Sequence, residues 1–208
     1  MAEQIFPTKG NLIKAKRQLA QANMGYELMD RKRNILVREM VTMAEEAKTL
    51  RADIESTYVE AYEALAKANT TLGLVTELAR TIPVDDSLDL SVRSVMGVEL
   101  PTVSAEIPAI TEPAYPMRLT NSDFDNAYIC FNKVKRITAR LAEVENCIYR
   151  LAVAIKKTQK RANALRNIMI PKFEAQVKFI TNALDEKDRE EFSRQKVIKH
   201  TKLKKSTH

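Results

Sequence analysis

The chain has 208 residues, and its 4 glycines, 7 prolines and 6% aromatic residues are not the composition of a compact globule. Its 29% charged and 45% apolar residues are instead typical of chains that form long helices. The net charge of +7 would suit a nucleic-acid partner, but six of these charges lie at the very end of the chain, so the remainder is close to neutral and disfavours that partner.

The first predicted helix covers residues 8–80. From Leu12 to Ile54 its apolar residues recur at steps of three and four, with Arg33 as the only charged residue among them. An average step of about 3.5 residues keeps an apolar stripe on one side only if the helix winds left-handed around a partner, so a coiled coil is predicted. This stripe, called the seam below, includes Leu12, Leu19, Leu36, Leu50, Ile54, Leu65 and Leu72.

Residues 81–120 are predicted to form a small head between two helices. They hold five of the seven prolines, and prolines at these positions exclude a continuous helix. Leu90 and Val92 alternate with polar residues ahead of Gly97, and Leu100 and Val103 follow it, which predicts one short β-hairpin that turns near Gly97. The residues after Pro101 are expected to form an extended strap that returns to the second helix.

The second predicted helix covers residues 121–193. Ser122, with Asp125 three residues later, resembles the capping box at a helix start. The basic tail that follows, residues 194–208, is expected to be flexible. The seam of this second helix includes Leu141, Ile148, Leu151, Ile155, Leu165, Phe173, Ile180 and Leu184.

The two arms, residues 1–80 and 121–193, have similar lengths, which favours folding back on each other. The predicted fold is therefore all-α: a long antiparallel two-helix left-handed coiled-coil hairpin with a small irregular or β-hairpin head at residues 81–120. If Arg80 of the first helix lies beside Asn121 of the second, Gly25 and Pro171 lie at similar levels along the hairpin. Glycine weakens a helix and proline kinks one, so we expect either a flexible bend at this level or a kink without functional consequence.

Groups that carry catalysis are scarce in this sequence. The only histidines are His200 and His208, both in the tail, and there is no glycine-rich phosphate loop. Cys130 and Cys147 lie on one predicted helix about 25 Å apart, too far for a disulfide, so each is interpreted as a small apolar filler in a reducing compartment. The prediction is a non-enzymatic protein without cofactor or metal. No segment reaches the roughly 18 apolar residues of a membrane span, so a cytoplasmic location is expected.

Partner binding remains as the predicted activity, and several residues are candidates for it. For Arg33 the favoured interpretation is a stem along the groove with the guanidinium in solvent, and the alternative is an outward contact with a partner. The other candidates are basic and apolar residues. The alternative to partner binding is a solvent-exposed helix face for the basic ones and additional core packing for the apolar ones. They are the basic residues Lys156, Lys157, Lys160 and Arg161 and the apolar residues Leu74, Leu78 and Ile129.

Residues at both ends of the chain form a recognisable pattern. Near the start these are Pro7, Thr8, Lys9, Asn11, Leu12, Leu19, Ala22, Gly25, Leu28, Lys32, Arg33 and Leu36. Near the end they are Arg161, Asn163, Ala164, Leu165, Ile170, Pro171, Glu174, Glu186, Arg189, Glu190 and Phe192. Together they resemble the opening and closing patterns of one family, the D subunit of V-type and archaeal A-type rotary ATPases.

The resemblance implies a central-stalk rotor subunit that carries torque between ATP chemistry and proton or sodium translocation in a membrane ring. Its partners would be the A and B subunits of the catalytic hexamer around the terminal ends, the F subunit on the stalk, and a funnel-shaped subunit facing the head. The chain would then be peripheral to the membrane on the cytoplasmic side. Two other classes stay open: a freestanding coiled-coil scaffold, and a basic helical hairpin that binds nucleic acid with a steep salt dependence.

Overall fold

The computed structural model describes residues 6–84, 88–105 and 115–206. The chain divides into two compact units, which are described separately. The terminal unit comprises Met1–Arg33 and Lys157–His208, and the middle unit comprises Asn34–Lys156. None of the helices in the described ranges is long and apolar enough to span a lipid bilayer.

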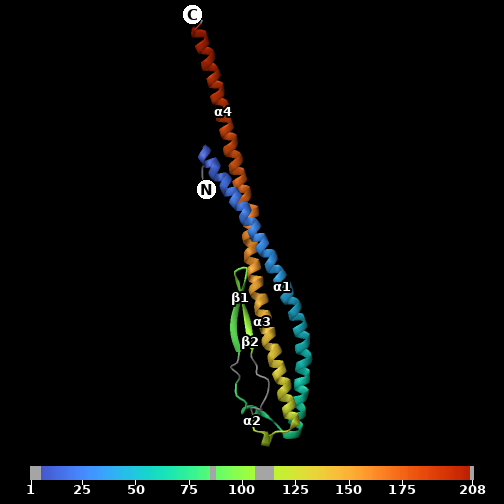
Figure 1. Cartoon of the computed structure of the whole chain (residues 1–208). Helices are drawn as coiled ribbons and strands as arrows, with labels where there is room; N and C mark the ends of the chain where they lie inside the picture. Colours follow the sequence, from blue (N-terminus) through green and yellow to red (C-terminus); the bar gives the residue numbers. More distant parts are fainter. Residues whose placement is uncertain (1–5, 85–87, 106–114, 207–208) are drawn as a thin grey trace. The chain divides into compact units, whose positions relative to one another are not determined.

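Helix α1 (Lys9–Leu72) is continuous and belongs to both units (Figure 1). The Thr8 hydroxyl accepts a hydrogen bond from the Asn11 amide at 3.2 Å, which caps its start. Its predicted end near residue 80 is wrong, because Gly73 has a φ of 79° and this left-handed conformation ends the helix at Leu72. A separate short helix, α2 (Thr76–Ala79), follows.

The predicted β-hairpin is confirmed as strands β1 (Leu88–Val95) and β2 (Val98–Ala105), which pair antiparallel. Met96 and Gly97 form the two-residue turn, with φ angles of 51° and 73°. Both values are positive, as a type I′ hairpin turn requires, so Gly97 supplies one of the two left-handed positions without steric cost. The predicted turn position is therefore right.

The 3-10 helix η1 (Met117–Leu119) leads into helix α3 (Ser122–Ala164). The expected capping box at Ser122 is wrong, because Asn121 is the capping residue: its side-chain oxygen accepts the Phe124 amide at 3.0 Å. Asp123 and Asp125 lie in the first turn, where negative charge is stabilised by the helix dipole.

The second arm is not one uniform helix. A π-helical turn, η2 (Leu165–Met169), separates α3 from α4 (Ile170–Ser206). Pro171, the second residue of α4, lacks an amide hydrogen, and its ring would press on the carbonyl of the preceding turn. The wider π turn relieves this clash. Helix α4 continues to Ser206 through the segment expected to be a flexible tail, and residues 207 and 208 lie outside the described ranges.

Helices α1 and α3 pair antiparallel within the middle unit, and the pairing begins at their joined ends. The Asn121 side-chain amide donates a hydrogen bond to the Thr71 hydroxyl at 2.7 Å. The expected pairing of Arg80 with Asn121 is therefore wrong by about nine residues, because α1 ends early at Gly73. In the terminal unit, correspondingly, Gly25 faces Leu165 and not Pro171.

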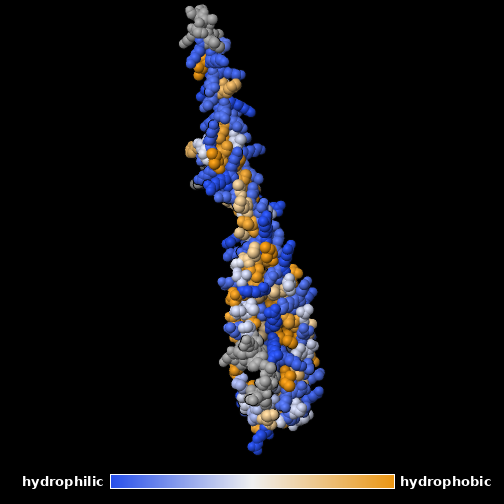
Figure 2. Space-filling view, in the orientation of Figure 1, coloured by the Kyte–Doolittle hydropathy of each residue, from blue (hydrophilic) through white to orange (hydrophobic). Residues whose placement is uncertain are grey.

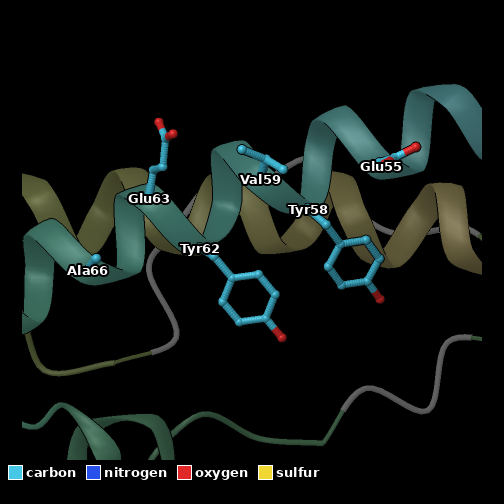
Figure 3. A pocket seen from close by; sticks show the side chains of 6 residues that line it. All are labelled: Glu55, Tyr58, Val59, Tyr62, Glu63 and Ala66. Atoms are coloured by element: carbon cyan, nitrogen blue, oxygen red, sulfur yellow. The ribbon is translucent and has the colours of Figure 1, made fainter.

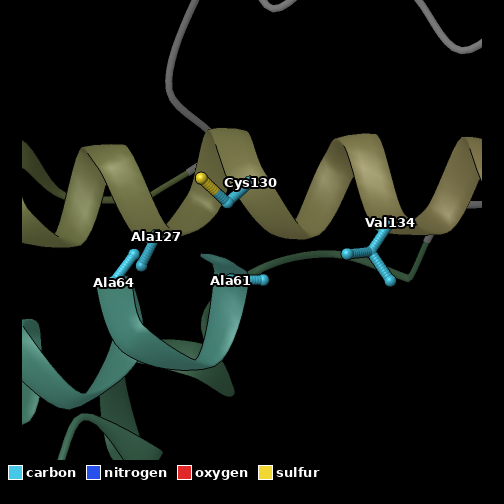
Figure 4. Close-up of a cluster of buried hydrophobic side chains, with 5 residues drawn as sticks. All are labelled: Ala61, Ala64, Ala127, Cys130 and Val134. Carbon is cyan, nitrogen blue, oxygen red and sulfur yellow. The ribbon is translucent and has the colours of Figure 1, made fainter. Parts of the chain in front are cut away.

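Small residues bring α1 and α3 close together in one core cluster of the middle unit. Ala61 and Ala64 of α1 pack against Ala127, Cys130 and Val134 of α3 (Figure 4). Ala61 is completely buried, so its short side chain leaves the facing helix within contact distance. The all-α coiled-coil class with a small β-hairpin between the helices is confirmed, and the prolines Pro108 and Pro113 of the predicted head lie outside the described residues.

Gly25→Ala is expected to stabilise the protein by about 0.5–1 kcal/mol, because alanine restricts the unfolded chain and favours helix. The added Cβ would meet Leu165 Cδ1 at 3.7 Å, an ordinary van der Waals contact. Gly73→Ala is the control, since its φ of 79° strains any other residue and should make the change destabilising. Urea denaturation of both variants measures the difference, and a destabilised Gly25→Ala would show that this site needs glycine.

Candidate interaction surfaces

The seam residues form a half-buried band along the helices. Leu36, Leu151 and Ile180 are completely buried, and Leu72, the last residue of α1, is 37% exposed. The remaining predicted seam residues are all half-buried: Leu12, Leu19, Leu50, Ile54, Leu65, Leu141, Ile148, Ile155, Leu165, Phe173 and Leu184. Half-burial is what a narrow two-helix interface provides, because no third layer covers the flanks of the stripe.

Ion pairs join α1 to α3 beside the seam in the middle unit. Arg140 donates from Nε and Nη2 to one oxygen of Glu46, at 2.9 and 2.6 Å, and from Nη1 to Glu143 at 2.8 Å. Burial alone would lower the pKa of Arg140, but the hydrogen bonds to Glu46 and Glu143 outweigh it and raise the pKa. Arg51 pairs with Glu145 at 2.7 Å. The sequence offered no sign of these pairs, because they depend on the register between the arms.

Arg33 makes the corresponding link in the terminal unit. Its guanidinium pairs with Asp30 at 2.6 Å and donates to the Gln159 side-chain oxygen at 3.0 Å, which connects α1 to α3. The side chain is 28% exposed. The guanidinium therefore contacts groups of its own chain, and an outward contact of Arg33 with a partner stays a hypothesis.

The β-hairpin packs alongside the helices of the middle unit. Leu100 of β2 is completely buried against Leu36 of α1 and against Cys147 and Leu151 of α3. Polar contacts surround this apolar centre. Arg93 pairs with Glu39 at 2.7 Å, Arg150 donates to the Glu99 carbonyl at 3.1 Å, and the Cys147 thiol donates to the Pro101 carbonyl at 3.3 Å.

Both cysteines are free and buried. Burial and the nearby Glu143 carboxylate raise the pKa of Cys147, which disfavours the reactive thiolate. Within the described residues no group of three metal-ligating side chains is present.

An aromatic groove of about 510 Å³ opens on α1 of the middle unit (Figure 3). Tyr58 and Tyr62 stack one helical turn apart, and Tyr62 meets the edge of Phe131 from α3 with ring centroids 5.7 Å apart. Figure 3 shows both tyrosines pointing to the same side of the helix, with Glu55 and Ala66 at the two ends of the row of lining residues and Glu63 pointing to the other side. Sequence reasoning missed this groove: the spacing of Tyr58 and Tyr62 puts them on one side of the helix, but their contact with Phe131 depends on the register between the arms.

A second aromatic cluster surrounds Tyr115, whose ring contacts Phe124 and Tyr128 edge to face. Its hydroxyl donates to Asp125 at 2.6 Å and so ties the segment ahead of η1 to the first turn of α3. Burial, and then the hydrogen bond to Asp125, raise the pKa of Tyr115 far above its usual value near 10.

Tyr115→Phe is expected to lower the unfolding free energy by about 1 kcal/mol near neutral pH, because one hydrogen bond is lost. In the parent chain the unfolded state loses the phenol proton above about pH 10 while the folded state keeps it, so stability falls with rising pH there. The variant should show a shallower alkaline fall in urea titrations, and Tyr149→Phe, 70% exposed, is the control. Identical slopes for parent and Tyr115→Phe would contradict the assignment.

The remaining predicted contact residues separate into exposed and packed ones. Leu74 is 87% exposed and Ile129 is 45% exposed, so both are available to a partner. Leu78 is not, because it packs against the cluster of Ala68, Val75, Tyr115 and Phe124. The basic residues are all exposed: Lys156, Lys157, Lys160 and Arg161.

The end of α4 is exposed at every residue from Asp185 to Lys202. Its ion pairs, Arg189 with Glu186 and Arg194 with Glu190, both lie within the helix itself. Figure 2 shows a predominantly hydrophilic surface there with scattered hydrophobic spots. Phe192, in this segment, is 59% exposed. This helix end is therefore a polar surface without a packing partner among the described residues.

Comparison with known proteins gives one consistent result. The family model for the ATP synthase D subunit matches residues 11–200. The V-type ATP synthase D subunit from Thermotoga neapolitana is 45% identical over 94% of this chain and 97% of its own. The A-type ATP synthase D subunits from Pyrococcus horikoshii and Pyrococcus furiosus are 35% and 37% identical, over 94% and 93% of this chain and 93% and 92% of their own. Since the family model covers nearly the whole chain, the chain belongs to the family of ATP synthase D subunits, as a component of a V-type or A-type ATPase.

Proposed function

We propose that this chain is the central-stalk rotor of a V-type or A-type ATP synthase. In this role it transmits torque between ATP hydrolysis or synthesis in the hexamer of A and B subunits and proton or sodium translocation in the membrane ring. The chain itself performs no chemistry. The F subunit would bind on its helices, and the funnel-shaped subunit would connect it to the ring.

The observation that carries the proposal is a pair of long helices linked side to side at several levels. Within the middle unit, Arg140 with Glu46 and Arg51 with Glu145 join α1 to α3. An exposed ion pair contributes only about 0–1 kcal/mol to the free energy of unfolding. We therefore expect these pairs to act mainly by opposing the sliding of one helix along the other. A shaft that twists as one body needs this resistance to sliding.

ATP-driven rotation tests the proposal. The chain is assembled with the A, B and F subunits of the same organism on a fixed support, and a bead is attached through Lys67→Cys. Lys67 is exposed, while Cys130 and Cys147 are buried and should not be labelled. ATP should drive rotation of the bead in one direction, and complexes without ATP supply the control. A complex that hydrolyses ATP while the attached bead stays still would overturn the proposal.

The exposed basic residues of α3 are expected to contribute to coupling by attracting acidic groups of the surrounding hexamer. Replacing Lys156, Lys157, Lys160 and Arg161 together with Gln should reduce the torque produced per ATP, most clearly at low salt, because exposed charges are screened within about 10 Å at 0.1 M salt. The control replaces Lys48 and Lys133 with Gln, since both are also exposed and neither carries the bead. Unchanged ATP-driven rotation in the fourfold variant would rule this contribution out.

A further inference from the structure

Strand β1 presents its apolar side chains to solvent. Leu88, Leu90 and Val92 are 53%, 70% and 62% exposed. They alternate with Asp89, Ser91 and Arg93, which by the period of a strand lie on the opposite face. In a half-buried strand the apolar set normally faces the core, so here the usual orientation is reversed.

The pairing of the strands fixes this orientation. Arg93 is opposite Leu100, and Val92 is opposite Pro101, so Arg93 and Leu100 share the face that meets the helices. Leu100 is fully buried there, and Arg93 pairs with Glu39 of α1. Because a shift of one residue would exchange the two faces and remove both contacts, the exposure of Leu90 and Val92 is a specified feature of the fold.

The size of this face indicates what covers it. Besides Leu88, Leu90 and Val92, this face holds the half-buried Pro101 and Val103 of β2, which is still far fewer than the about 20–30 residues that a stable interface needs on each side. A second copy of the chain would therefore not be held by this face alone. A face of this size suits one element of a partner that is already held by a larger assembly.

The shape and charge of the face indicate which element fits. Leu88 to Val92 spans about 13 Å at roughly 3.3 Å per residue, which corresponds to two to three turns of an α-helix. Beyond Val92, Glu99 pairs with Ser94 on the same face and is exposed, and its side chain makes no ion pair within the described residues. A matching helix therefore carries three apolar residues on one stripe and a basic residue one turn further on.

We infer that the outer face of the β-hairpin, defined by Leu88, Leu90, Val92 and Glu99, docks an amphipathic helix of another subunit of the ATP synthase. The apolar stripe of that helix lies across the three apolar side chains, and a Lys or Arg meets the Glu99 carboxylate. The inference rests on the proposed function for the complex in which this partner is found. It adds to that function the place on this chain where a partner subunit binds, the secondary structure of the partner segment and the charge of one of its residues.

Site-specific photocrosslinking in the assembled complex tests the inference. The photoreactive residue p-benzoylphenylalanine replaces Leu90 in one chain and Ser91 in the control, which is exposed on the opposite face. The Leu90 probe should react with one subunit, at a segment with apolar residues at i, i+3 or i+4, and i+7, and the Ser91 probe should not. Equal reaction from both probes, reaction with a second copy of this chain, or no reaction with any other subunit would overturn it.

Two further variants keep the test independent of folding. Leu90→Ser with Val92→Ser should leave the Tm of the isolated chain within a few degrees, since both side chains are exposed, while crosslinking from a probe at Leu88 falls severalfold. Glu99→Lys alone should also reduce that crosslinking, and Glu99→Gln should reduce it less. Equal yields from all these chains would exclude the docking face.

The result also separates this inference from the proposed function. If the complex assembles and its bead rotates but the probes at Leu88 and Leu90 contact no other subunit, the docking face fails and the rotor stands. If the chain does not assemble with the A, B and F subunits, the rotor proposal fails and the docking face fails with it.

Discussion

Leu151→Ala is expected to lower the unfolding free energy by about 2–5 kcal/mol, the usual range for a buried leucine. Leu151 is completely buried where three elements meet, in contact with the cluster of Leu36 from α1 and Leu100 from β2. Truncation therefore removes apolar contacts to both partners at once. The cavity left behind closes poorly, because the hairpin is also held by the ion pair of Arg93 with Glu39.

Urea denaturation of the isolated chain followed by circular dichroism measures this effect. Val153→Ala is the matched control on the same helix, because Val153 is 52% exposed and its truncation should change stability by less than about 0.5 kcal/mol. Cys147 provides a second readout, since loosening the hairpin should increase the rate at which its buried thiol reacts with a labelling reagent. A Leu151→Ala variant as stable as Val153→Ala would show that the three-element cluster carries little of the fold.

Ending the chain after Asp185 is expected to abolish most of the coupling while leaving the fold intact. The removed part of α4 is exposed at every described residue, so the Tm of the isolated chain should hardly change. In the proposed rotor this helix end lies inside the hexamer and receives its torque. ATP-driven ion pumping by the reconstituted complex should therefore fall severalfold, and ATP hydrolysis should fall less.

A full-length control separates the length of α4 from its charge. Replacing Arg194, Lys196, Lys199 and Lys202 with Gln keeps the length of the helix and removes four of the eight basic residues that the truncation deletes. If length is decisive, this chain should pump far better than the truncated one; if charge is decisive, the two should be similarly impaired. Full pumping by the truncated chain would contradict a torque-bearing role for this end of the helix.

Several features of the structure were visible in the sequence because they depend on local patterns. The seam follows from apolar residues at steps of three and four, and Leu36 and Leu151, both on it, are completely buried. The hairpin turn at Met96 and Gly97 follows from alternation on either side of a glycine, which tolerates the left-handed conformation. Local patterns failed at the helix ends, where Gly73 and Asn121 compete with neighbouring candidates for the capping position.

The sequence by itself determined two long helices with one apolar stripe each, a hairpin between them, and membership of one family, since each of these depends on short-range periodicity or direct residue identity. The tertiary structure decided the register between the arms, the ion pairs such as Arg140 with Glu46, and the packing of Leu100 onto the helices. A repeating stripe is compatible with many registers of similar apolar burial, so the choice among them depends on where α1 ends and on contacts between residues distant in the chain.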